Sequence, residues 1–141
     1  MPISPYLRFQ TPELEQQWQA GVLHPALAAV VLFAARLHFL YTRQPALITS
    51  LYRPGDPGVH GQLPCQGADL SVRFLAGIQK DNWPAAINEA FPYVYTQAQG
   101  KQTALVHEAF DSAGNSRGPV HLHLQVGPLE PTPEMPESFI V

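Results

Sequence analysis

Basic residues are scarce in this 141-residue chain. Eight Lys and Arg stand against eleven Asp and Glu, for a formal net charge of −3 at neutral pH. The basic residues are scattered singly, so the sequence lacks the positive patch that nucleic-acid binding requires. We therefore expect no nucleic-acid partner.

Cysteine and long apolar runs are also nearly absent. Cys65 is the only cysteine and cannot form an internal disulfide, and no basic-then-apolar secretion signal opens the chain. The most apolar segment, residues 26–35, is far shorter than the roughly 20 residues of a membrane span. These features predict synthesis in the cytoplasm, a buried core helix and no membrane span, and they give no sign of an oligomeric state.

Proline and glycine are abundant instead, with fifteen and ten residues. This composition predicts short elements joined by many loops. Because 45% of the residues are hydrophobic, the chain can bury one core. We expect a single domain over residues 1–126, with its core in 24–126, and a proline-rich tail over 127–141.

Helix signals occur at three places. Thr11 and Pro12 predict a first helix that stops near Gly21, and His24-Pro25 predicts a longer one with an apolar stripe to about Thr42. Residues 80–91 predict a third, capped by Asp81 or Asn82, with Pro84 in its first turn.

Strand signals cover residues 46–52, 69–73, 93–96, 103–110 and 120–126. Together with the helices they predict a small α+β domain. Its antiparallel sheet has about four strands and carries a zinc site on its face.

The candidate site combines a loop with a strand. His60 and Asp69 lie in or beside a Pro/Gly-rich loop, whereas His121 and His123 are two positions apart on a predicted strand and so share one face. A catalytic zinc ion takes three such ligands and leaves a fourth position to water. Arg53, at the end of the first strand, is expected to face the substrate, where a guanidinium would hold a carboxylate or an oxyanion.

Each of these residues also has an ordinary structural interpretation. A His-x-His strand can be a half-buried polar pair, His60 a plain loop residue and Asp69 the cap of a turn. His107 is either a neighbour of the metal ligands or a structural residue, and Cys65 is explained as a loop residue or a small buried hydrophobe.

The order of these motifs resembles the zinc peptidases of the D-alanyl-D-alanine carboxypeptidase and Hedgehog-like fold. This group includes lysostaphin-type and murein endopeptidases. The matching parts are Ser50-Leu51-Tyr52-Arg53-Pro54, His60, Gly67-Ala68-Asp69-Leu70 and Val120-His121-Leu122-His123.

The resemblance implies His60, Asp69 and His123 as metal ligands and His121 as the catalytic or water-orienting residue. It also implies Arg53 as a group that stabilises the transition state, with Ser50 and Tyr52 beside it in the substrate-binding site. Two departures stand out: His60 and Asp69 are nine positions apart, which is longer than usual in the group, and Val120 occupies the position of a catalytic Glu found in many carboxypeptidases.

The function implied is a zinc-dependent metallopeptidase, a carboxypeptidase or endopeptidase, that cuts an amide bond in the peptides of bacterial peptidoglycan. Phage-borne versions, to which this compact chain is similar, act on the cell wall after release or from the phage particle. Two alternatives stay open. His121-x-His123-x-Gln125 also resembles the histidine-triad nucleotidyl hydrolases and transferases, and the domain could bind zinc without catalysis.

Overall fold

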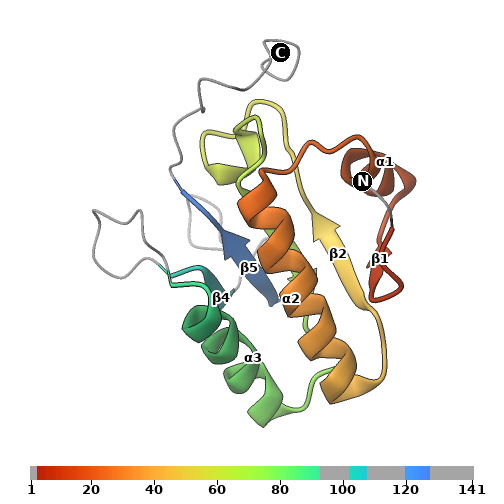
Figure 1. Cartoon of the computed structure of the whole chain (residues 1–141), viewed down its shortest axis with the longest axis vertical. Coiled ribbons are helices and arrows are strands. Elements are labelled where there is room, and N and C mark those ends of the chain that lie inside the picture. The colour runs from red at the N-terminus through yellow and green to blue at the C-terminus, as the bar shows by residue number, and fades with distance from the viewer. Residues whose placement is uncertain (1–2, 93–101, 108–119, 128–141) are drawn as a thin grey trace.

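The computed structural model describes residues 3–92, 102–107 and 120–127 (Figure 1). Its elements, in chain order, are β1 (Leu7–Phe9), α1 (Pro12–Gln19), α2 (Pro25–Thr42), β2 (Ala46–Ser50), the 3₁₀ turn η1 (Val59–Gly61), β3 (Gly67–Ser71), α3 (Gly77–Ala90), β4 (Ala104–His107) and β5 (His121–Gln125). The predicted α+β class is confirmed.

The strands form one open sheet in the order β1-β2-β3-β5-β4. The pairs β2–β3, β3–β5 and β4–β5 are antiparallel, as expected. The sequence did not predict β1, which pairs in parallel with β2 from Leu7 opposite Ala46 to Phe9 opposite Ile48. The sheet is therefore mixed and has five strands. The strand β1 was missed because a three-residue strand is too short to show a period-2 pattern.

Most predicted strand boundaries need small adjustments. β2 ends at Ser50, and β3 begins at Gly67, two residues before its predicted start. The predicted strand over 93–96, residues 108–110 and the tail beyond 127 lie outside the described residues.

The first two helices begin as predicted. The Thr11 hydroxyl accepts a hydrogen bond from the Leu14 N–H, and Gly21 adopts a positive φ of 72° just after α1. His24 caps α2 through Nδ1, which accepts from the Ala26 N–H at 3.0 Å.

The third helix begins earlier than predicted, at Gly77, so Pro84 lies inside it and neither Asp81 nor Asn82 is its cap. The Gln79 side chain instead accepts from the Ala76 N–H at 2.9 Å and fixes the first turn. Trp83, fully buried, donates from its indole nitrogen to the Ala34 carbonyl of α2 at 2.9 Å. Burial of Trp83 offsets the loss of the helical hydrogen bond that Pro84, which has no N–H, cannot donate.

The helices α2 and α3 cover the same face of the sheet (Figure 1). Seven residues of α2 are buried: Leu27, Ala28, Val30, Val31, Ala34, Ala35 and His38. Among the described residues α2 is the one helix long and apolar enough to cross a membrane by length and composition, and in this fold it is the core helix. The opposite face of the sheet carries the candidate site.

Asn88 fastens the edge strand β4 to α3. Its amide donates to the Ala104 carbonyl and accepts from the Ala104 N–H, both at 2.8 Å. We predict that Asn88→Leu lowers the free energy of unfolding by about 1–3 kcal/mol, because it leaves two backbone groups unpaired. Urea unfolding measures this, and Glu89→Ala, at an exposed position of the same helix, should change it by less than about 0.5 kcal/mol.

His38 gives the fold a pH dependence. Its side chain is buried against Trp83, and Nδ1–H donates to the Gln44 carbonyl at 2.8 Å. Burial lowers the pKa of His38 below 6.5, and the bond to Gln44 opposes this only in part. Since a lowered histidine pKa stabilises the fold above the unfolded pKa, this contribution is lost as the pH falls below 6.5.

We therefore predict that wild-type protein loses more unfolding free energy than His38→Leu between pH 7.5 and pH 5.5. Urea unfolding with a chelator in both samples measures the difference. Equal losses in the two proteins would contradict the assignment.

Candidate metal centre

Three elements bring the predicted site residues together. Asp69 lies in β3, directly opposite His123 of β5. His60 lies in η1, on the loop that joins β2 to β3, and His121 lies two residues before His123 on the same face. The register of two adjacent strands thus positions the carboxylate and both strand histidines.

The Asp69 carboxylate is the centre of this group. Its Oδ1 atom lies 2.9 Å from His123 Nδ1, 3.3 Å from His60 Nε2 and 3.6 Å from His121 Nε2. Asp69 and His60 are almost fully buried, with 6% and 3% of their surface exposed. Three imidazole nitrogens therefore converge on one buried carboxylate oxygen.

Burial alone would raise the pKa of Asp69. The hydrogen bond to His123 and the nearby His60 and His121 outweigh that effect and hold the pKa well below its ordinary value. Asp69 is therefore a carboxylate at neutral pH, which is the form that binds a metal ion.

His60 is oriented by a backbone carbonyl. Its Nδ1 lies 2.6 Å from the Leu51 oxygen, and because a carbonyl only accepts, Nδ1 must carry the hydrogen. The other nitrogen, Nε2, is buried and makes no hydrogen bond, since the 3.3 Å approach to Asp69 is poorly aligned. An unpaired imidazole nitrogen beside a buried carboxylate is unfavourable unless a cation lies between them.

The spacing of the ligand atoms suits a metal ion. One atom from each of His60, Asp69 and His123 lies within 4.8 Å of the other two. Ligands about 2.0–2.1 Å from a tetrahedral ion lie about 3.4 Å apart, close to the 3.3 Å and 2.9 Å found here. The three predicted ligands can therefore hold a metal ion.

His121 and His107 form a second pair beside the ligands. They lie opposite each other on β5 and β4, with ring centroids 4.7 Å apart. The ring of His107 also lies 5.6 Å from that of His123. His107 is thus a neighbour of the metal ligands, which was one of its two predicted roles.

Small residues let the loop approach the sheet. A Cβ atom added to Gly67 would lie 2.5 Å from the Val59 side chain and 3.3 Å from the His60 ring. A Cβ atom on Gly61 would overlap the Asp56 carbonyl. Both glycines are needed for η1 to place His60 over β3.

The predicted substrate-binding residues lie around the loop. Ser50 is opposite Asp69 in the β2–β3 pairing, and the Tyr52 backbone is bound by the Gln17 side chain. The Arg53 guanidinium is half exposed and pairs with Asp56 at 3.3 Å. Its predicted contact with substrate stays a prediction.

Cys65 is a buried hydrophobe, as one would expect from its surroundings in the loop. Burial raises the pKa of its thiol to about 11, and Sγ donates to the Gly67 carbonyl at 3.2 Å. A thiol in this state is a poor metal ligand.

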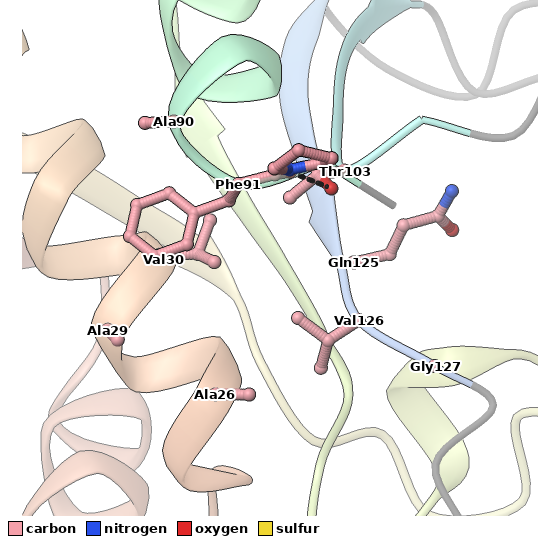
Figure 2. Close-up of a pocket in the computed structure, with 10 residues that line it drawn as sticks. Ala26, Ala29, Val30, Ala90, Phe91, Thr103, Gln125, Val126 and Gly127 are labelled. Atoms are coloured by element: carbon pink, nitrogen blue, oxygen red, sulfur yellow. Dashed lines mark hydrogen bonds between the residues drawn. The ribbon is translucent and has the colours of Figure 1, made fainter. Parts of the chain in front are cut away.

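An apolar pocket of about 330 Å³ lies on the helix side of the sheet, between the first turns of α2 and the end of α3 (Figure 2). Gln125 borders it, but in Figure 2 the Gln125 side chain points away from α2, whereas Val126 points toward it. The Oε1 atom of Gln125 lies 3.2 Å from His123 Nε2. No part in the metal site was predicted for Gln125, although its period-2 spacing after His121 and His123 places it on their face.

Comparisons with protein-family models, curated proteins and solved structures find no match to this chain.

Proposed function

We propose that this protein is a zinc-dependent peptidase that hydrolyses an amide bond in the peptides of bacterial peptidoglycan. One observation carries the metal part of the proposal. Two imidazole nitrogens and one carboxylate oxygen, all acceptors when they bind a metal, converge in a largely buried cluster, and His60 Nε2 has no other partner.

The donor set favours zinc. Two imidazoles and one carboxylate form a common ligand set of catalytic zinc sites and leave a fourth position for water or substrate. When bound there, zinc would polarise a carbonyl and lower the pKa of a water ligand to about 7.

Metal binding and proton transfer would fall to different residues of the chain. His60, Asp69 and His123 would hold the ion. His121 presents Nε2 at 3.6 Å from Asp69 Oδ1, beyond hydrogen-bonding distance but beside the ligands. It would take a proton from the attacking water and deliver it to the leaving amine.

Arg53 would bind negative charge on the substrate. Its pairing with Asp56 lies on the exposed part of the loop, and its backbone N–H donates to the His60 carbonyl at 2.7 Å. Exchange of Asp56 for a substrate carboxylate would keep a charge-assisted bond at the guanidinium. The choice of peptidoglycan as substrate rests on the motif resemblance alone.

Zinc content tests the ligand set. We predict about one zinc ion per chain in protein purified without chelator, and loss of zinc in His60→Ala and in His123→Ala, because each change removes one of three protein ligands. His121→Ala should keep its zinc. Elemental analysis after gel filtration measures all four proteins.

The matched control is His24→Ala, which removes a histidine that caps α2 outside the site. It should bind as much zinc as the wild type. Zinc retained by both His60→Ala and His123→Ala would place the ion elsewhere and contradict the proposed centre.

Turnover tests the role of His121. We predict that zinc-loaded wild type cleaves purified muropeptides and that His121→Ala is slower by about 10²–10⁴-fold, the usual contribution of a general acid–base residue. Mass spectrometry of the digests measures the rate and identifies the bond. Cleavage at the wild-type rate by His121→Ala would show that another group handles the proton.

The same samples separate the alternatives. Thermal stabilisation by nucleotides in metal-free protein, without muropeptide cleavage, would favour a histidine-triad enzyme. Bound zinc with no turnover of any muropeptide would favour a binding module.

A further inference from the structure

The amide of Gln125 connects a metal ligand to a backbone carbonyl. Gln125 is buried, with 9% of its surface exposed. Its Nε2 donates to the Gln102 carbonyl at 2.8 Å, while its Oε1 lies 3.2 Å from His123 Nε2. Among the described residues, Gln125 is the one hydrogen-bond partner of His123 Nε2.

The Gln102 carbonyl determines which way the amide faces. A carbonyl can only accept, so the group toward Gln102 must be the NH₂ of Gln125. The amide oxygen then faces His123, and because that oxygen also only accepts, His123 Nε2 must carry a hydrogen. The Asp69 carboxylate also only accepts, so Nδ1 donates to it at 2.9 Å, and this hydrogen, rather than the one on Nε2, is the one that a bound metal ion would replace.

The Gln102 carbonyl is itself held in place. Thr103, the next residue, is buried, and its hydroxyl donates to the Phe91 carbonyl at the end of α3 at 2.6 Å, the bond drawn in Figure 2. The Thr103 carbonyl also accepts from the Gln125 N–H at 2.9 Å. The acceptor that orients Gln125 is therefore fixed to both α3 and β5.

We infer that Gln125 is a positioning residue that selects the tautomer of His123 able to bind metal through Nδ1. This inference rests on the proposed metal centre. His60 is set in the opposite way, because the Leu51 carbonyl occupies its Nδ1 and leaves Nε2 for the ion. The two histidine ligands would thus bind through different ring nitrogens, each chosen by an acceptor outside the ligand set.

Imidazole nitrogen NMR of the zinc-loaded wild type is the direct test. Long-range ¹H–¹⁵N spectra should show His123 with Nε2 protonated and Nδ1 bound, and His60 with Nδ1 protonated and Nε2 bound. Zinc bound to His123 through Nε2 would overturn the inference and leave the proposed function standing.

Two substitutions test the mechanism. Gln125→Met keeps the length of the side chain but removes the acceptor, and we expect zinc affinity to fall by about 10–100-fold, the usual effect of losing an outer partner of a metal ligand. Gln125→Glu keeps an oxygen toward His123 and should retain the Nε2–H tautomer and most of the affinity, although it lowers stability because its second oxygen faces the Gln102 carbonyl. Competition with a chromophoric chelator measures affinity, and circular dichroism shows whether each variant folds.

The matched control is Gln79→Met, which also removes a half-buried glutamine amide that bonds to the backbone, in the first turn of α3 and away from the ligands. It should lower stability and leave zinc affinity unchanged. Equal loss of affinity in Gln125→Met and Gln79→Met would show a general effect of destabilisation and overturn the inference. A wild type that binds no zinc would instead refute the proposed function itself.

Discussion

The candidate centre depends on the buried carboxylate of Asp69. An ionised carboxylate with 6% of its surface exposed is costly unless positive charge or several donors surround it. Here its neighbours are imidazoles, and His60 gives its one hydrogen to the Leu51 carbonyl rather than to Asp69. The His123 hydrogen bond and the nearby His60 and His121 keep Asp69 ionised, but His60 Nε2 stays without a hydrogen-bond partner. A metal ion would satisfy the carboxylate and the unpaired nitrogen of His60 together.

Backbone pairing gives this arrangement its precision. The two ligands on strands, Asp69 and His123, are directly opposite each other on adjacent strands whose other face packs on α2. The third, His60, comes from a loop, but the loop is bonded to the strand ends through Arg53 N–H to the His60 carbonyl and Gln66 N–H to the Val59 carbonyl. Sites built on strands are more precise than sites on loops, and these backbone hydrogen bonds tie the loop of His60 to the strands.

The sequence predicted the residues that converge in the candidate centre better than it predicted their surroundings. A period-2 strand and a glycine-rich loop are local signals, so His60, Asp69 and His123 could be identified without coordinates. The part played by Gln125 could not, because it depends on the Gln102 carbonyl, which only the fold brings near. The early start of α3 was missed for a related reason: burial of Trp83 against α2 overrides the local preference of Pro84 for a first turn.

The two ring nitrogens of a histidine lie at different distances from its backbone, so the nitrogen that binds the ion affects where the ion would lie. Nδ1 is closer to the backbone than Nε2, so a His123 that binds through Nδ1 would hold the ion low over β3 and β5. That suits the short side chain of Asp69, directly opposite. His60 approaches from the loop with its longer-reaching Nε2, and His121, one row further along the sheet beside Ser71, also presents Nε2 to the same carboxylate oxygen. His121 Nε2 lies 3.6 Å from that oxygen, compared with 2.9 Å for His123 Nδ1, so the distances agree with the proposed roles of His123 as a ligand and His121 as a proton carrier.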